Sequence, residues 1–339
     1  MVLEAGRRNR NFKVLRSSGC GLFLKQVKSV NSIENSTLKR EANCYLVAQK
    51  YNEWAAVMPS FVDHDTKRQC LTLELVPNGV NLSDYHRGFA RLPTVVGKLV
   101  GTALGCFHRV TRGEVLHTDE ATFFPKRIPW ILFFHRDNNR VSGGVIQLGD
   151  QIRANLFLSE SMDRLYQQWR FDGVVHGDMK WDNCVIYTSA QGEQELKIID
   201  WELLDYGDAS WDVAGFFHSY LTHWISSMPF SDDMAPTRLI EDAKTTLDKV
   251  IPAMQKFWDS YLDASGLPHL QAASFLLRAI EHTAARLLQT AFEALYYTAA
   301  MTNQTKVLVQ LSENILRDPV LAAREYFGLN VEGAECRQH

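Results

Sequence analysis

The sequence contains little that would place the chain in a membrane or on a nucleic acid. The first ten residues are rich in arginine and hold no apolar core of the kind that a signal peptide needs. The most apolar stretch, residues 283–301, is interrupted by Arg286, Gln289 and Glu293, which predicts an amphipathic helix rather than a membrane span. The formal net charge is −3 and no strongly basic domain stands out, which argues against nucleic acid as the main partner.

Cysteine is also scarce. The six cysteines are scattered, with no Cys-x-x-Cys pair: Cys20, Cys44, Cys70, Cys106, Cys184 and Cys336. Most lie in apolar surroundings, which is typical of reduced core residues in a cytoplasmic protein. The chain has no internal repeat and no low-complexity tract. Its 339 residues, of which 46% are hydrophobic, suffice for one large or two modest domains with real cores.

The informative part of the sequence lies between residues 174 and 202. Three short apolar runs predict buried strands, at residues 174–175, 184–187 and 196–199. Gln191-Gly192-Glu193 is a polar turn that would join the last two strands into a hairpin. These strands are expected to hold three polar side chains on rigid ends: Asp178, Asn183 and Asp200.

These three side chains have the chemistry that phosphoryl transfer from ATP requires. Asp178 would accept or orient the proton of an acceptor hydroxyl, while Asn183 and Asp200 would hold Mg²⁺, a hard ion that prefers oxygen ligands. Lys180 could reach the γ-phosphoryl group as charge spreads over its oxygens. The alternative is that Asp178 and Asn183 only cap local turns. That alternative does not explain why His-Gly-Asp, an Asn five residues later and a strand ending in Ile-Ile-Asp occur together.

The run His176-Gly177-Asp178-Met179-Lys180-Trp181-Asp182-Asn183, followed by Asp200-Trp201-Glu202, resembles the aminoglycoside phosphotransferase and choline kinase group. That group, a relative of the protein kinases, has His-Gly-Asp in place of His-Arg-Asp, and Asp-x-Glu or Asp-x-Asp in place of Asp-Phe-Gly. The resemblance implies an α+β, protein-kinase-like fold with a small β-rich N-terminal lobe and a large helical C-terminal lobe. It implies that ATP and Mg²⁺ bind between the lobes, with Asn183, Asp200 and Glu202 at the metal.

The resemblance divides the chain into residues 1–80, the nucleotide-binding lobe, and residues 81–339, which would carry the catalytic loop and the acceptor site. Residues 70–77 predict a last strand that runs into the linker between the lobes. In kinases the backbone of such a segment binds the edge of the adenine. By resemblance, Glu74, Leu75 and Val76 take this position here, with Glu74 and Val76 as the nucleotide-binding residues.

Within the first lobe, residues 12–15 and 21–25 predict strands, and residues 37–50 predict a helix. By resemblance, Lys25 on the second strand and Glu41 on the helix form the pair that positions the α- and β-phosphates. The alternative is an exposed lysine and an ordinary surface glutamate.

The loop Gly6-Arg7-Arg8-Asn9-Arg10-Asn11 stands where the family has a Gly/Ser/Asn-rich cover over the phosphates. With one glycine and three arginines it matches that pattern poorly. A basic N-terminal arm in solvent is the alternative to a phosphate clamp.

The second lobe is predicted to be mainly helical, with helices at residues 95–110, 237–250, 253–264, 274–302 and 305–316. By resemblance, Asp212 begins a helix and holds the catalytic-loop backbone, and Asp208 is expected to cap that helix. His108 is expected to cap the C-terminus of another helix. The run His135-Arg136-Asp137 suggests the protein-kinase loop, but no Asn follows at the required distance, so we reject it.

The acceptor is expected to be a hydroxyl group, and three hypotheses stay open. A small molecule, such as an aminoglycoside, choline, an amino alcohol or a sugar, is the family default. A Ser or Thr of a ribosomally made precursor peptide is the second, because the motifs look similar to the lanthipeptide-type branch. A pseudokinase is the third, and the intact Asp178, Asn183, Asp200 and Lys25 argue against it. Five aromatic residues are expected mainly in the core, or alternatively in an acceptor pocket: Phe257, Trp258, Phe292, Tyr296 and Tyr297.

Overall fold

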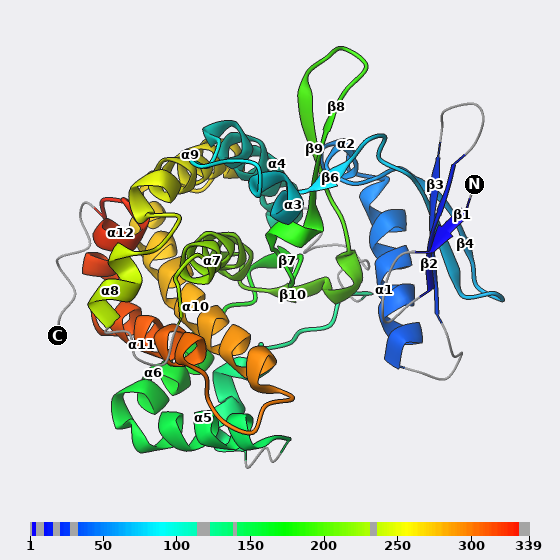
Figure 1. Cartoon of the computed structure of the whole chain (residues 1–339). Helices are drawn as coiled ribbons and strands as arrows, with labels where there is room; N and C mark the ends of the chain where they lie inside the picture. The colour runs from blue at the N-terminus through cyan, green and yellow to red at the C-terminus, as the bar shows by residue number, and fades with distance from the viewer. Residues whose placement is uncertain are drawn as a thin grey trace.

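The structure of the chain is a computed structural model that describes residues 2–4, 10–15, 21–27, 33–113, 123–137, 141–230 and 236–331. It has a small N-terminal part with an antiparallel sheet and a larger part that is mostly helical (Figure 1). The predicted two-lobed α+β fold is therefore confirmed.

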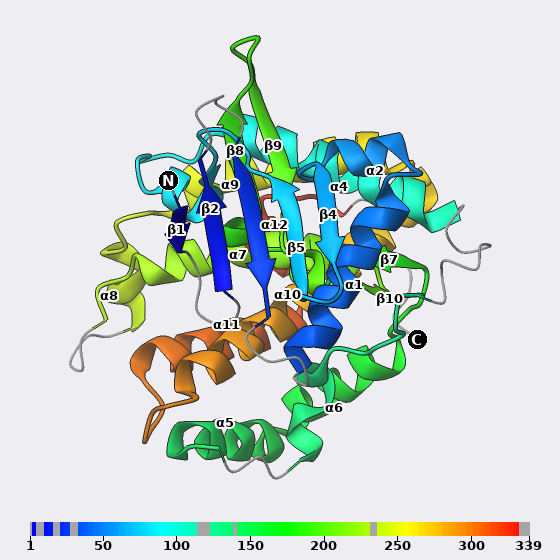
Figure 2. The same cartoon turned by 90° about the vertical axis from the view of Figure 1, so that its right-hand side faces the viewer.

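Five antiparallel strands form the N-terminal sheet: β1 Val2–Glu4, β2 Arg10–Val14, β3 Leu22–Gln26, β4 Phe61–Asp65 and β5 Cys70–Glu74. Their order is β1-β2-β3-β5-β4, so β3 with its Lys25 lies in the middle of the sheet (Figure 2). The edge strand β4 was not predicted, because its Asp63-His64-Asp65 segment is polar, as solvent-facing edge strands often are. The predicted turn at residues 17–20 and most of the loop at 6–11 lie outside the described residues.

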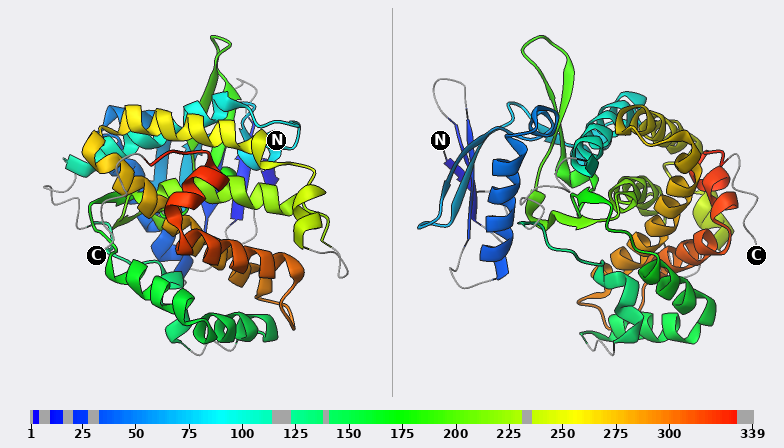
Figure 3. Two further views of the ribbon diagram at one scale, coloured as in Figure 1. Left: turned by 90° about the vertical axis from the view of Figure 1, so that its left-hand side faces the viewer. Right: turned by 180° about the vertical axis from the view of Figure 1, so that it is seen from behind.

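Helix α1, Ile33–Ala48, lies between the sheet and the helical part (Figures 1 and 3). Its residues Leu38, Ala42 and Tyr45 are buried, as their spacing predicted, because they recur on one face of the helix. Leu46, which was expected on the same face, is exposed. The helix begins and ends earlier than the predicted range. A short helix, α2, Asn52–Ala56, leads from it toward β4.

A second, three-stranded sheet has the order β6-β8-β9 and joins the two parts. It contains β6, Val80–Asn81, and a hairpin of β8, Cys184–Thr188, with β9, Gln194–Ile198, that extends away from the molecule (Figure 1). The predicted hairpin is confirmed. Two more strands pair with each other: β7, Gly173–Val175, which precedes the hairpin in the chain, and β10, Asp205–Gly207, which follows it.

Ten helices are described in the C-terminal part: α3 Leu82–His86, α4 Thr94–Gly113, α5 Gly143–Ala154, α6 Leu156–Gln167, α7 Ser210–Ser226, α8 Pro236–Glu241, α9 Leu247–Ser265, α10 His269–Leu295, α11 Asn303–Arg317 and α12 Pro319–Phe327. Three short 3-10 helices accompany them: η3 Trp130–Arg136, η4 Trp181–Asn183 and η5 Trp201–Leu203. None of the helices in the described ranges is both long and apolar enough to cross a membrane.

The predicted helix at residues 237–250 is wrong, because the chain breaks between α8 and α9. The predicted break near Pro252 is also wrong: Pro252 lies inside α9, whose buried Val250, Ala253 and Met254 continue one apolar face past it. Tertiary packing here outweighs the cost of one lost backbone hydrogen bond. The rejected run at residues 135–137 lies at the end of η3, where His135 and Arg136 bind Asp163.

Helices α4 and α9 pack with their backbones in contact. Gly97, Gly101 and Gly105 lie on one face of α4, at a spacing of four residues. A Cβ atom added to Gly101 would lie 2.3 Å from the carbonyl oxygen of Phe257 on α9. Backbone atoms cannot move aside as a side chain can, so this face of α4 requires glycine.

We expect Gly101→Ala to lower the free energy of unfolding by about 1–3 kcal/mol, because the new methyl group overlaps a backbone oxygen. In an exposed helix the same change would instead add about 1 kcal/mol of stability. Urea unfolding of the variant gives the sign directly. Thr102→Ala, at the exposed neighbouring position, is the matched control and should change stability little. A Gly101→Ala protein as stable as the wild type would show that the two helices do not pack at this distance.

Candidate active site

The loop after β7 is fixed by its own backbone geometry. Gly177 has φ +81°, and a Cβ atom there would lie 2.5 Å from the carbonyl oxygen of Leu203. Only glycine fits this position. The ring of His176 accepts a hydrogen bond at Nδ1 from the Asp178 backbone N–H (3.2 Å), so its Nε2 donates to the carbonyl oxygen of Ile199 (2.9 Å). Gly177 and His176 thus hold Asp178 in a defined position.

Asp212 anchors this loop from helix α7. Its two carboxylate oxygens accept hydrogen bonds from the backbone N–H groups of His176 (2.7 Å) and Gly177 (2.9 Å), which confirms the predicted contact with the loop. His108 Nε2 lies 3.1 Å from the same carboxylate. Burial alone would raise the pKa of Asp212, but the hydrogen bond from His108 and the charges around it outweigh burial and lower it.

Two predictions about neighbouring residues have different outcomes. His108 does not cap a helix end, because α4 continues to Gly113; it bridges Asp212 and the Tyr261 hydroxyl instead. Asp208 does bind the backbone N–H of Ser210 at the start of α7, at 3.0 Å. It also accepts a hydrogen bond from Arg278 Nε at 2.9 Å, which sequence reasoning did not predict.

Asp178 has two side-chain partners in the loop. Its Oδ2 accepts hydrogen bonds from Lys180 Nζ (2.6 Å) and Asn183 Nδ2 (3.0 Å). Asn183 Nδ2 also donates to the Asp178 carbonyl oxygen (2.8 Å), so the amide nitrogen faces Asp178 and Oδ1 is left for another ligand. Burial lowers the pKa of Lys180, but the attraction of Asp178 is stronger and the net shift is upward.

The loop rests on Trp181, which packs on the buried His86 and the half-buried His223. The ring centroid of His86 lies 4.1 Å from that of Trp181, and the centroid of His223 lies 5.2 Å from it. Neither ring nitrogen of His86 has a hydrogen-bond partner in the part of the chain that the structure describes. Burial, aided by repulsion from His223, lowers the pKa of His86 to about 3.

This shift predicts how stability depends on pH. Below the ordinary histidine pKa of 6.5 the unfolded chain binds a proton at His86 that the folded protein does not, until the pH approaches about 3. The free energy of unfolding should therefore fall as the pH is lowered through this window. In His86→Phe, we expect the slope of the free energy of unfolding against pH to be smaller by up to about 1.4 kcal/mol per pH unit. Urea unfolding at several pH values measures it, with Tyr85→Phe on the same helix as the control. Equal slopes in wild type and His86→Phe would contradict the assignment.

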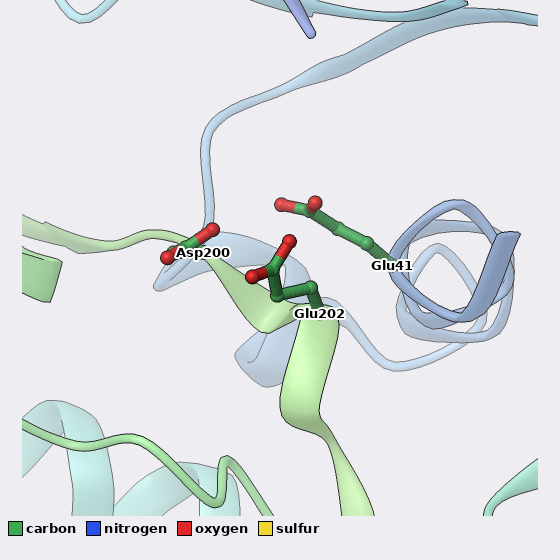
Figure 4. A group of neighbouring side chains, drawn as sticks. All are labelled: Glu41, Asp200 and Glu202. Atoms are coloured by element: carbon green, nitrogen blue, oxygen red, sulfur yellow. The ribbon is translucent and has the colours of Figure 1, made fainter. Parts of the chain in front are cut away.

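A second cluster is centred on Lys25, which is only 6% exposed. Its Nζ lies 2.7 Å from Glu41 Oε2, 2.6 Å from Asp200 Oδ1 and 2.9 Å from Glu202 Oε2. Figure 4 shows these three carboxylates pointing toward one another, from α1 and from the segment after β9. The structure thus brings together the predicted Lys25 and Glu41 with the two acidic residues of the Asp-Trp-Glu run.

The backbone conformation of Asp200 and an ion pair of Arg40 place this cluster. Asp200 has φ +66°, in the left-handed region that Asp and Asn tolerate best among residues with a side chain. Arg40, next to Glu41 on α1, donates from Nη1 to Asp205 Oδ1 (3.1 Å) and so joins α1 to the helical part. Burial, opposed by Arg40, raises the pKa of Asp205 to about 6. Sequence reasoning did not predict this contact.

The donor set of the cluster fits a divalent cation. Three carboxylates face one ammonium group, and one oxygen atom of each lies within 4.8 Å of the other two. Burial alone would lower the pKa of Lys25, but the three carboxylates raise it. Burial raises the pKa of Glu41 to about 7. The attraction of Lys25 opposes this shift, while repulsion from Asp200 and Glu202 adds to it. Mg²⁺ prefers such oxygen ligands, and Asn183 Oδ1 could add a neutral one.

A cavity of about 270 Å³ lies between the sheet and the hairpin. Its apolar walls include Phe23, Leu73 and Val185, and Lys25 and Asp200 lie at its polar end. The predicted adenine segment, Glu74, Leu75 and Val76, also lines it. A mainly apolar cavity that ends at a lysine suits a nucleotide with its phosphates at the polar end.

A wider cavity of about 930 Å³, here called the front cleft, begins at the same polar end. Asp178, Lys180, Asp200 and Glu202 line one side, and the other side carries the aromatic and polar residues Trp130, Gln289, Phe292, Glu293, Tyr296 and Tyr297. The expectation that the five aromatic residues lie mainly in the core is correct for Phe257 and Trp258. Phe292 is partly buried against the core and also lines the cleft, while Tyr296 and Tyr297 are exposed and line the cleft, which is the alternative expectation. Tyr296 and Tyr297 lie beyond the end of α10, and a hydrophobic pattern does not show whether protein or a ligand covers a residue.

The phosphotransferase enzyme family matches residues 2–244 of the chain, which is well over half of it and includes both clusters. The chain belongs to this family. The protein is therefore a kinase-type phosphotransferase, as its sequence motifs predicted. No curated protein matches it significantly in sequence.

Solved structures share the fold of this phosphotransferase at low sequence identity. An ethanolamine kinase of Plasmodium vivax is 13% identical, with a TM-score of 0.56; the match covers 92% of this chain and 81% of the other. An aminoglycoside 2′-phosphotransferase in complex with GDP is 13% identical, with a TM-score of 0.54 and coverage of 94% and 93%. A glucosamine kinase in complex with glucosamine, ADP and phosphate is 14% identical, with a TM-score of 0.54 and coverage of 93% and 80%.

Proposed function

We propose that this phosphotransferase transfers the γ-phosphoryl group of ATP, with Mg²⁺, to a hydroxyl group of a small molecule. The observation that carries the proposal is that Lys25 and Asp200 line both the nucleotide-sized cavity and the front cleft, while Asp178 lines the front cleft but not the nucleotide-sized cavity. A phosphoryl group held at Lys25 and Asp200 would therefore face an acceptor held beside Asp178.

In this proposal Asp178 acts on the acceptor. Its Oδ2 is bound by Lys180 and Asn183, while its Oδ1 has no hydrogen bond among the described residues and can take the hydroxyl proton. The hydroxyl oxygen then forms a bond to the γ-phosphorus as the bond from that phosphorus to the β,γ-bridging oxygen breaks. The products are a phosphate monoester and ADP, with the proton left on Asp178.

The remaining residues position the nucleotide. Asn183, Asp200 and Glu202 would hold the divalent cation, which supplies positive charge beside the phosphate oxygens when bound. Lys25, kept in place by Glu41, would contact the phosphates, and Lys180 could approach the transferred group. The backbone at Glu74 and Val76 would bind the adenine edge.

A small-molecule acceptor is favoured over the other two hypotheses. The named relatives in fold act on ethanolamine, aminoglycosides and glucosamine, which are all amine-bearing alcohols. No observation in the structure favours a precursor peptide. A pseudokinase would have no need of Asp178, Asn183, Asp200 and Lys25 arranged as they are around two adjoining cavities.

The test is turnover with purified protein, ATP and MgCl₂ against amino alcohols, amino sugars and aminoglycosides. ADP release, together with a mass gain of one phosphate on an acceptor, is the expected result. Ser- and Thr-containing peptides run in parallel. Phosphate on a peptide, with no small acceptor turned over, would favour the peptide hypothesis. Bound ATP with no turnover in either set would favour the pseudokinase.

A further inference from the structure

Asp178 also borders a second cavity, of about 330 Å³, which shares no lining residue with the nucleotide-sized cavity. This rear pocket and the front cleft share four lining residues: Trp130, Asp178, Leu203 and Gln289. Neither Lys25 nor Asp200 lines the rear pocket, so it is not an extension of the nucleotide cavity. The predicted catalytic carboxylate of Asp178 therefore borders two cavities, the front cleft and the rear pocket.

The two spaces differ in chemistry. The rear pocket is mainly apolar, with Ile128, Val175, Trp169 and Trp211 among its walls. Its charged groups include two arginines, Arg127 and Arg286, against one carboxylate other than Asp178, that of Asp205. In the front cleft, Glu202 and Glu293 add carboxylates beyond Asp178 and Asp200, and the cations are Lys25 and Lys180.

This asymmetry would orient an acceptor. Lys25 and Lys180 are already paired with carboxylates or directed toward the phosphates, whereas Glu293 lies on the opposite wall, among the aromatic rings. An ammonium group on the acceptor is thus favoured in the front cleft, where Glu293 and the faces of the aromatic rings would attract it. Arg286, held by the Met179 carbonyl oxygen (2.8 Å) and stacked on Trp211, would repel a cation in the rear pocket.

We propose, on the basis of the proposed function, that the acceptor is an amphiphilic amino alcohol whose hydroxyl group is internal. Its apolar arm enters the rear pocket, its cationic arm lies in the front cleft, and the hydroxyl group between them meets Asp178. An acceptor with a terminal hydroxyl group has only one arm, and would leave the rear pocket without an occupant. Each methylene buried there should raise kcat/KM by up to about fourfold.

Two isomers test the proposal directly. 1-Amino-2-octanol carries an internal hydroxyl group with a six-carbon arm, and 8-amino-1-octanol has the same atoms with a terminal hydroxyl group. With ATP and MgCl₂, we expect kcat/KM for phosphorylation of the internal isomer to be at least about tenfold higher, because only its apolar arm can enter the rear pocket. Product formation is followed by ADP release and by the mass of the phosphate ester.

Filling the rear pocket should remove this preference. We expect Ile128→Trp to bring the ratio of the two kcat/KM values close to one, and the smaller filling change Ile128→Phe to give an intermediate ratio. Leu156→Trp, at an exposed position on α6 outside both cavities, should keep the wild-type ratio. Thermal midpoints of all three variants verify that they are folded.

The outcomes separate this inference from the proposed function. Equal turnover of the two isomers, or a preference for the terminal isomer or for ethanolamine, overturns the internal-hydroxyl acceptor while the phosphotransferase activity stands. A preference that survives in Ile128→Trp overturns the rear pocket as its cause. Absence of phosphate transfer to every alcohol overturns both proposals.

Discussion

Asp178→Asn is expected to lower kcat/KM by about 10³- to 10⁴-fold while the affinity for ATP with Mg²⁺ changes by no more than a few-fold. The amide keeps the shape of the side chain and one oxygen that can accept the hydrogen bonds now made by Lys180 and Asn183. It cannot take the proton of a hydroxyl group. Steady-state turnover with a small acceptor, together with calorimetric titration of the nucleotide, measures both quantities.

The matched control for this prediction is Asp182→Asn, the same chemical change at an exposed position of the same loop. It should keep turnover within a few-fold of the wild type. Parallel loss of nucleotide affinity and turnover in Asp178→Asn would show instead that Asp178 maintains the structure of the loop. Activity within tenfold of the wild type would remove it from the role of base.

The central motif was predictable because its geometry is local. Asp178 and Asn183 lie five residues apart on one loop, between strands whose apolar runs are plain in the sequence. Gly177 and Asp200 adopt left-handed conformations that their residue types allow, so the backbone there agrees with the sequence. The contact of Asp212 with the loop was also predicted, but through the resemblance rather than through any local signal.

The acceptor side could not be predicted in the same way. Trp130 and Phe292 lie far apart in the sequence, yet their ring centroids are 4.7 Å apart and both line the front cleft. A hydrophobic pattern shows that a helix face is apolar but does not show whether protein or ligand covers it. Pro252 illustrates the opposite error: a strong local signal for a helix break is overridden by the buried face of α9.

The separate roles of the acidic residues around Lys25 also depend on long-range geometry. Asp200 and Glu202 belong to a motif, but the sequence does not reveal that both lie within 3 Å of the same lysine as Glu41. This arrangement leaves excess negative charge at one end of the nucleotide-sized cavity. Removal of one of these charges, that of Asp200, is therefore expected to have a large effect on cation binding and turnover.

Asp200→Asn is expected to abolish the Mg²⁺ dependence of nucleotide binding and to lower kcat/KM by about 10³-fold, since a carboxylate brings a full charge to the cation and an amide only a dipole. Asparagine is the appropriate replacement because it tolerates the left-handed backbone, φ +66°, that this position adopts. The thermal midpoint with ATP, followed during a MgCl₂ titration, reports binding without relying on turnover.

The comparison with two other variants makes the Asp200 prediction specific. Asn183→Ala removes a neutral ligand and should weaken the Mg²⁺-dependent shift of the midpoint without eliminating it. Asp182→Asn removes an exposed carboxylate from the same region and should leave that shift unchanged. Asp200→Asn also frees Lys25 from its shortest ion pair, so the midpoint without nucleotide must be measured for each variant. If Mg²⁺ still raises the midpoint of Asp200→Asn as it does that of the wild type, the cation is held elsewhere and Asp200 serves Lys25 alone.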